Sequence, residues 1–410
     1  MKNNNNMLLS ASVSLLFAFS ANSETMPVLV KDNGIKQPTI TKIVEADYDL
    51  VNLDALDIPI EQQPVHFSQA ISTADKASFN NKGYTDVSDE YWFEATGREL
   101  MLGVAINISQ PGALIRLSGK HGKNQTKEGW QHSIDPEAVS LLKAGHKLGA
   151  AFTQKVSAEQ FATANIFPNS SALQVNKTLG TGKFTLKVEQ ALQASQRYMV
   201  NVKEKNAEHK LHLAIDKQSY RQGQDIYFNA DVFNSHGEAL PAHQKVSVKL
   251  PNGEVQPLQV SQVNKQFKVA LPQVHHEQER GQLYELMIDT AAQHNGIKVR
   301  RNGKVAFAVS KATARLEGKV NHHADAIEFN LNVASEGRYE ISGIVYGMNS
   351  QGKSVAFMLS RSAYHLSAGL HKKSLQLDKA IINKSGLQAP YTVKSVQLLD
   401  QSRLALLQQL

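Results

Sequence analysis

Residues 211–232 read LHLAIDKQSYRQGQDIYFNADV, and this stretch decides the fold class. Apolar residues occupy every second position from Leu211 to Ile215 and again from Phe228 to Val232, with a polar, glycine-containing turn between them. An alternation with a period of two is typical of a β-strand with one buried face. The stretch therefore predicts two strands joined by a turn.

The pattern continues on the C-terminal side of this stretch. Alternating apolar residues return at 246–250 and 305–309, and Asn295-Gly296 has the composition of a tight hairpin turn. We count about seven strands in about 105 residues, which is the size of an immunoglobulin-like sandwich. Residues 206–311 are therefore predicted to form one β-sandwich domain.

Three motifs of this unit resemble the macroglobulin-type domains of bacterial α-2-macroglobulin-like proteins. They are Tyr220-Arg-Gln-Gly223-Gln-Asp-Ile226, Asn234-Ser-His-Gly237 and Val246-Ser-Val-Lys-Leu-Pro-Asn-Gly253. The resemblance covers about residues 208–311 and implies a fold but says little about function. The thioester of that family needs a cysteine, and this sequence has none, so protease trapping by that chemistry is not expected.

The preceding unit, residues 86–205, is predicted to be a β-sandwich with short helices. Leu102, Val104, Ile106 and Ile108 alternate as one strand, and Ser157-Ala-Glu-Gln160 resembles a helix capping box. Trp92 is expected to anchor the core of this sandwich, because a buried tryptophan is common in that architecture.

The remaining parts complete the domain plan. Residues 312–410 repeat the strand pattern, with alternating apolar residues from Ile327 to Val333, and are predicted to form a C-terminal β-sandwich. Residues 24–85 are polar and turn-rich and are predicted to form an arm or linker, with a linker favoured over a binding arm. The prediction is an all-β protein with three tandem immunoglobulin-like or β-sandwich domains.

An export signal precedes the arm. Lys2 is followed by an apolar run from Met7 to Ala21, and Ala21-Asn22-Ser23 places small residues where a signal peptidase reads them. Residues 1–23 are therefore expected to be a signal peptide that is cleaved before Glu24. The mature chain is expected in the periplasm or outside the cell, and no membrane span is expected because no later apolar run is long enough.

The whole arrangement resembles the uncharacterised secreted multidomain immunoglobulin-like proteins of γ-proteobacteria that are grouped as a domain-of-unknown-function family. The resemblance spans most of the chain. It implies tandem sandwiches and no established activity.

Charge and cysteine content exclude several classes. The net charge is +7 and no basic helix is apparent, so nucleic-acid binding is not expected. A sequence without cysteine has no thiolate nucleophile, no cysteine-ligated zinc and no iron–sulfur cluster.

Histidine is the remaining candidate for metal binding. His275-His276 and His322-His323 are adjacent pairs, and neighbouring side chains on a strand point to opposite faces. The same argument separates His209 from His212. His275-His276 lies in a predicted loop, where a solvated pair is favoured over a metal site. No metal site and no cofactor are therefore predicted.

No catalytic template matches the sequence, so no catalytic or cofactor-binding residue is assigned. Gly-x-Ser-x-Gly and glycine-rich phosphate loops are absent. Trp130 lies in the polar stretch Lys127-Glu-Gly-Trp130-Gln-His132 and is the one candidate ligand contact, with a partly buried loop anchor as the alternative.

The function predicted from these observations is not enzymatic. We expect an exported protein that binds an unknown protein or surface glycan, in the cell envelope or outside the cell, through its tandem domains. Two alternatives stay open. One is an exported hydrolase or hydrolase accessory with an unrecognised carboxylate site. The other is a structural spacer in an envelope assembly.

Overall fold

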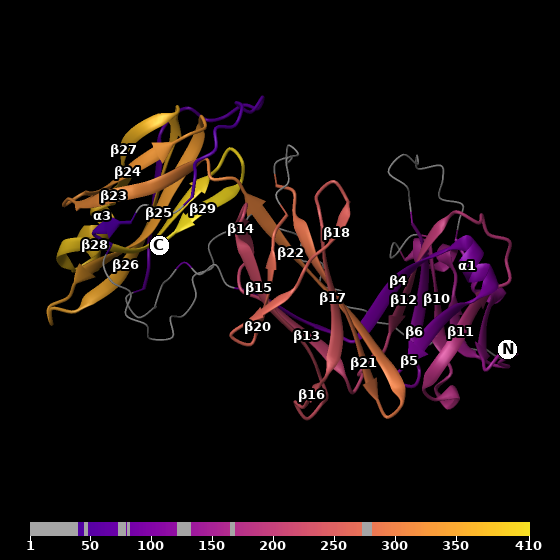
Figure 1. Cartoon of the computed structure of the whole chain (residues 1–410). Coiled ribbons are helices and arrows are strands. Elements are labelled where there is room, and N and C mark those ends of the chain that lie inside the picture. The colour runs from indigo at the N-terminus through magenta and orange to yellow at the C-terminus, as the bar shows by residue number, and fades with distance from the viewer. Residues whose placement is uncertain are drawn as a thin grey trace, which may run out of the picture.

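In the computed structural model, three β-sandwiches follow one another along the molecule (Figure 1), which confirms the predicted all-β class. None of the helices in the described part of the chain has the length and apolar character that a membrane crossing needs. The structure describes residues 40–44, 48–72, 79, 83–120, 133–164, 169–272 and 281–410.

The first sandwich packs two antiparallel sheets around one apolar core. Its larger sheet has the order β4 (Glu90–Thr96), β12 (Arg197–Lys203), β6 (Leu114–Gly119), β10 (Ser170–Val175) and β9 (Phe152–Val156). Its smaller sheet has the order β5 (Val104–Ile108), β11 (Gly182–Val188), β7 (Val139–Lys143) and β8 (His146–Lys147). The inward residues of both sheets, such as Leu117 and Phe184, are almost completely buried.

The central sandwich contains the stretch that decided the fold class. One sheet has the order β19 (Ser261–Val263), β20 (Gln266–Ala270), β15 (Asp225–Phe233), β13 (Lys210–Ile215) and β3 (Tyr84–Ser88), and β16 (Ala239–Leu240) pairs with β15. The other has the order β14 (Ser219–Arg221), β22 (Ile297–Ser310), β21 (Tyr284–His294), β17 (Ala242–Lys249) and β18 (Val255–Pro257). Tyr220 is buried, and its hydroxyl donates to Asp216, which fixes the turn between β13 and β15.

The C-terminal sandwich has the longest strands. One sheet has the order β2 (Val65–Ala70), β26 (Ser354–Leu366), β25 (Gly337–Met348), β28 (Gln388–Asp400) and β29 (Ala405–Gln409). The other has the order β1 (Lys42–Ile43), β23 (Ala314–His322), β24 (Ala326–Val333) and β27 (Gly369–Gln376).

Short helices lie between the strands. They are α1 (Gly97–Leu102), η2 (Pro136–Ala138), α2 (Ala158–Thr163), η3 (Lys177–Leu179) and α3 (Lys379–Ser385). The capping box predicted at Ser157 is present at the start of α2. The strand predicted from Leu102 was wrong at its first residue, because Thr96 and Glu99 form a second capping box that starts α1. Leu102 ends this helix with 73% of its surface exposed, and β5 begins only at Val104.

Residues 24–85 do not behave as a free linker where the structure describes them. β1 adds to β23, and β2 adds to β26, so both strands belong to the C-terminal sandwich. β3 adds to β13 of the central sandwich. The arm is thus held by main-chain pairing with distant residues, which for β2 are almost 300 positions away in the sequence, and local composition does not reveal this pairing.

Trp92 is not the core anchor that we expected. Tyr91 is completely buried and points into the core, so the neighbouring Trp92 lies on the other face of β4, where it is half-buried. The main chain of Trp92 instead contacts the central sandwich, because its carbonyl oxygen accepts a hydrogen bond from Asn302 Nδ2 at 3.1 Å.

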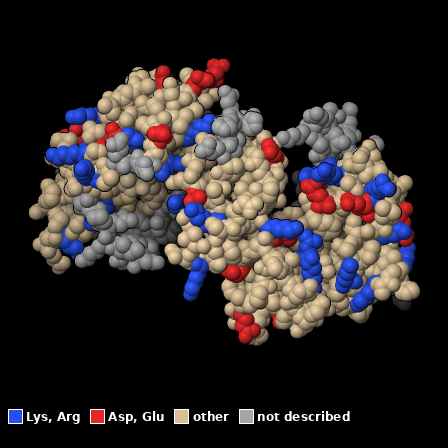
Figure 2. Space-filling view, in the orientation of Figure 1, with Lys and Arg blue, Asp and Glu red and all other residues tan. Residues whose placement is uncertain are grey.

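Basic and acidic side chains are scattered over all three sandwiches. On the face shown in Figure 2, both signs occur on each domain among the described residues. Some ion pairs join two exposed groups, such as Lys147 and Glu189 at 2.7 Å, and such pairs contribute little to stability.

Candidate functional site

The structure describes only some of the residues singled out from the sequence. Trp130 and the pair His275-His276 lie outside the described residues. His322 is at the end of β23, where its Nε2 is 3.1 Å from the carbonyl oxygen of Ile40, whereas His323 is exposed. The second histidine pair therefore does not converge on one point.

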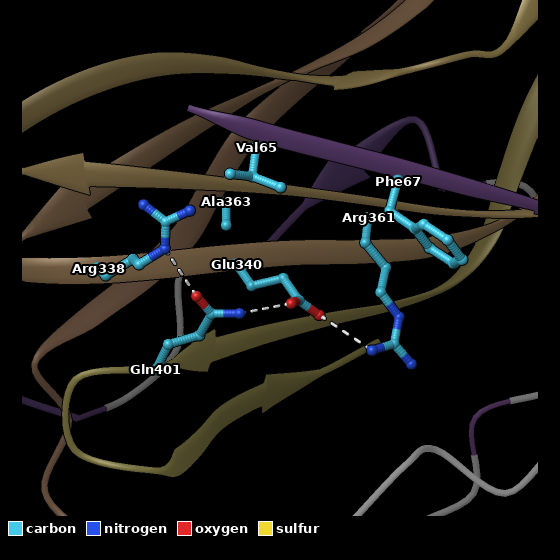
Figure 3. A pocket seen from close by; sticks show the side chains of 7 residues that line it. All are labelled: Val65, Phe67, Arg338, Glu340, Arg361, Ala363 and Gln401. Atoms are coloured by element: carbon cyan, nitrogen blue, oxygen red, sulfur yellow. Dashed lines mark hydrogen bonds and ion pairs between the residues drawn. The ribbon is translucent and has the colours of Figure 1, made fainter. Parts of the chain in front are cut away.

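A pocket of about 220 Å³ with both charged and apolar lining residues lies on the outer face of the C-terminal sheet (Figure 3). It spans strands β2, β26 and β25 and the turn after β28. The residues that line it are Val65, Phe67, Arg338, Glu340, Arg361, Ala363 and Gln401.

Strand alternation explains why these side chains share one face. Val65 is opposite Ala363, and Phe67 is opposite Arg361, in the register of β2 and β26. Glu340 on β25 is also opposite Ala363. The residues between them on β25, such as Tyr339, point into the core and are buried.

Arg338 forms a fixed wall of the pocket. Its Nη1 donates to the carbonyl oxygens of Glu61 and Gln63 at 2.6 and 2.9 Å, and its Nε donates to Gln401 Oε1 at 3.0 Å. Gln401 Nε2 donates in turn to Glu340 Oε2 at 2.7 Å. This network orders the pocket before any ligand binds.

Arg361 is less completely bonded. Its Nη1 is 3.9 Å from Glu340 Oε1, a long ion pair, and its buried Nε has no hydrogen-bond partner among the described residues. Burial raises the pKa of Glu340, although Arg361, Gln401 and Arg338 each lower it. An incompletely bonded guanidinium is suited to bind a carboxylate or phosphate.

The pocket offers binding chemistry more than catalytic chemistry. Glu340 is the only carboxylate among its lining residues, whereas most glycoside hydrolases use a pair. The lining also contains two exposed apolar side chains, Val65 and Phe67, at 48% and 56% exposure. A charged donor next to an apolar surface is a typical arrangement for recognising an acidic, partly apolar ligand.

The strand β2 also has an open edge. One edge pairs with β26, and no other described strand pairs with its second edge. Ile71 N donates to Phe357 O at 2.8 Å, one position beyond the end of β2. Because hydrogen-bonded pairs alternate along an antiparallel ladder, the main-chain groups of Phe67 point to β26, and those of Ser68 point to the open edge.

Sequence reasoning missed this site for an identifiable reason. The segment that contains β2 was assigned to a polar arm or linker, so its alternation Val65-His-Phe67-Ser was not used. The outer face of β25, which begins at Gly337, completes the pocket only where β2 and β26 lie beside it, and the sequence does not show that pairing.

The fold defines a protein made of successive β-sandwich domains, and comparisons with known proteins identify the family. The model of the N-terminal domain of the DUF4785 family, a domain of unknown function, matches residues 58–204, and the model of its C-terminal domain matches residues 312–410. Together they match more than half of the chain, which belongs to the DUF4785 family.

Solved structures give the same result for the fold. A DUF4785 family protein from Legionella pneumophila has a TM-score of 0.69 at 19% identity, over 90% of this chain and 98% of that one. This likeness shows the shared fold alone. No curated protein matches the chain.

The likeness to α-2-macroglobulin is weak. The native form of the Escherichia coli protein has a TM-score of 0.25 at 12% identity, over 80% of this chain and 20% of that one. Its trypsin-activated form has a TM-score of 0.20 at 14% identity, over 72% and 21%. Neither score supports an argument about function.

Proposed function

We propose that the protein is an exported, non-catalytic binding protein that takes up an extended segment of a partner protein along β2. The observation that carries this proposal is the open edge of β2 beside the Arg361 pocket. The N-terminal sequence pattern, with an apolar run from Met7 to Ala21, supports export to the periplasm or beyond the cell.

The binding mode follows from strand geometry. A partner strand added to β2 would pair with the outward main-chain groups of His66, Ser68 and Ala70. Its alternate side chains would lie over Val65 and Phe67, on the pocket face of the sheet. An acidic side chain there would reach Arg361, so main-chain pairing would supply affinity and the pocket would supply specificity.

Apolar exposure on β2 supports this binding mode. Edge strands of monomeric proteins usually carry charges, prolines or bulges that prevent pairing with another chain. β2 has the sequence VHFSQA, with no lysine, glutamate or proline, and Phe67 is more than half exposed. By contrast, the edge strand β27 of the second sheet contains Lys372 and Lys373.

The experiment is a crosslinking capture from envelope fractions and culture supernatant with the chain from Glu24 to Leu410. Ser68→Pro removes one outward N–H group and the hydroxyl that bonds to Ser360, and it leaves the main-chain pairing with β26 in place. Arg361→Gln removes the charge of the Arg361 side chain. Leu370→Ala is the matched control, because Leu370 is an exposed apolar residue on β27, with 75% exposure.

The proposal predicts a protein that is captured by the wild type and by Leu370→Ala, and that is lost or strongly reduced with Ser68→Pro and Arg361→Gln. Capture that is equal for all four chains would contradict it. Specific binding on a glycan array that Arg361→Gln abolishes and Ser68→Pro leaves intact would replace the partner protein with an acidic glycan.

A further inference from the structure

Three potential metal ligands converge where the first sandwich meets the central one. Glu208 and His209 lie in the connector between β12 and β13, and His294 ends β21. One ligand atom from each of the three residues lies within 4.8 Å of the others. His209 and His294 are 85 positions apart in the sequence, so only the fold brings them together.

His209 is held in place independently of any ligand. Its side chain is buried, and the centroid of its ring is 4.4 Å from that of His294. Arg301 Nε donates to the carbonyl oxygen of His209 at 2.8 Å, and Arg301 Nη2 donates to Glu204 Oε2 at 2.7 Å. The connector is therefore clamped to β22 immediately beside the histidine pair.

The imidazole nitrogens of His209 are available for coordination. None of them is hydrogen-bonded to another residue in the part of the chain that the structure describes. Metal ligation uses the lone pair of a neutral imidazole nitrogen, and a ring nitrogen without a protein partner can supply it.

We propose that Glu208, His209 and His294 bind one divalent transition-metal ion of the Zn²⁺ type. Two imidazoles and one carboxylate are a common donor set for zinc and leave a fourth position for water. The positive charge of Arg301 does not oppose the ion strongly, because Glu204 is its direct partner.

Small side-chain movements complete the geometry. Zinc–ligand bonds of about 2.0–2.1 Å in a tetrahedron place the ligand atoms about 3.3 Å apart. Glu208 is exposed and His294 is half-buried beside the hairpin turn Asn295-Gly296, so both can rotate toward the fixed His209. The amide of Asn295 is 3.0 Å from His294 Nε2 and, after an amide flip, can orient the ring as second-sphere partners do.

The bound ion would fasten the domain connector to the β21–β22 hairpin. Glu208 and His209 belong to the chain that leaves the first sandwich, whereas His294 belongs to the central one. The site would therefore hold the end of the connector, directly before β13, against the central sandwich. This role is independent of the partner strand proposed for β2.

The test is titration of the metal-free chain from Glu24 to Leu410 with ZnCl₂ by calorimetry, and with Co²⁺ by visible absorption. We expect one ion per chain and the absorption of tetrahedral Co²⁺. His294→Ala and Glu208→Gln should each weaken binding by at least about tenfold, because even second-sphere losses cost that much. Zn²⁺ should also raise the unfolding midpoint of the wild type more than that of either variant.

Two controls separate this site from other histidines. His212→Ala changes a histidine on β13 that packs on the ring of Phe233, at 5.3 Å between centroids. A double substitution of His275 and His276 by alanine removes the adjacent pair in the sequence. Both controls should bind as the wild type does. Absence of stoichiometric binding, or unchanged binding in His294→Ala and Glu208→Gln, would overturn the proposal.

Discussion

At the scale of single residues, the pair of Glu204 and Arg301 is the most deeply buried charge pair of the described structure. Their side chains are 0% and 1% exposed, and Arg301 Nη2 is 2.7 Å from Glu204 Oε2. Ser109 N also donates to Glu204 at 2.5 Å. Buried ions are tolerated only when both charge and hydrogen bonds are satisfied, and here three segments of the chain provide them.

Removing one partner of this pair should be costly. Glu204→Ala leaves the guanidinium of Arg301 buried without its counter-charge, and we expect a loss of about 3–5 kcal/mol in the free energy of unfolding. Urea denaturation measures this loss. Glu94→Ala breaks exposed pairs with Lys120 and Arg197 and should cost no more than about 1 kcal/mol. Equal losses in the two variants would contradict the account.

The carboxyl of Glu340 should make stability depend on pH. Burial raises its pKa above the ordinary value of 4.5, so the folded state holds the proton more tightly than the unfolded state. The resulting stabilisation is complete below the ordinary value and is lost as the pH rises through the folded pKa, at about 1.4 kcal/mol for each pH unit that separates the two pKa values. Urea denaturation across this window should show Glu340→Gln losing less stability than the wild type. If the free energy of unfolding changed with pH in the same way for both proteins, Glu340 would not be the source of the pH dependence.

Which single residues matter was harder to predict than which strands exist. Trp130 was chosen because it lies in a polar stretch, and its position is outside the described residues. The sequence argument separates His209 from His212 as residues of one strand, but His209 lies in the connector just before β13, which begins at Lys210. The neighbour of His209 in space is His294 on another hairpin, and no local spacing contains that information.

At the scale of elements, the alternation of apolar and polar residues predicted strands reliably where one face of the strand is buried and the other is not. Every second residue of β15 is buried, as predicted from Phe228 to Val232. The turn predicted at Asn295-Gly296 joins β21 and β22, and both residues have the positive φ that such turns require, 50° and 74°. The helix α1 was missed although Thr96 and Glu99 carried the capping-box signal.

The two edges of β2 should respond differently to proline. Phe67→Pro removes an N–H group that pairs with β26, and we expect a loss of roughly 1 kcal/mol or more in the free energy of unfolding, in addition to the lost side-chain contacts. Ser68→Pro removes an N–H group on the open edge and should cost less. Urea denaturation compares the two variants. A greater loss with Ser68→Pro would mean that the N–H group of Ser68, and not that of Phe67, points to β26.

At the scale of the whole molecule, the arm is a structural part of the C-terminal sandwich. Ile43 is buried in the main core of this domain, and Ile71 and Phe79 are buried in a smaller cluster that also contains Ile344. Main-chain contacts such as Val51 N to Ala312 O at 2.8 Å add to this packing. The all-β sandwich architecture could be predicted from the sequence. The pairing of the arm with the C-terminal sandwich could not, because the strands that it pairs with lie far away in the sequence.

Removal of residues 24–82 should therefore weaken the domain that is farthest away in the sequence. Each of the three buried apolar side chains contributes about 1.5–3 kcal/mol by burial, so we expect a clear loss of stability in residues 312–410. Hydrogen exchange by mass spectrometry should show faster exchange there and little change in residues 90–203. Faster exchange in the first sandwich alone would be inconsistent with this arrangement.

The central claim is that β2 is a paired strand on one side and an open edge on the other. Amide hydrogen exchange of the free protein, resolved by residue with NMR, tests it most directly. The account predicts slow exchange at Phe67 and Gln69, which point to β26, and fast exchange at His66, Ser68 and Ala70. Uniform protection along β2 would mean that its outer edge is already covered, and the proposed binding of a partner strand would then be wrong.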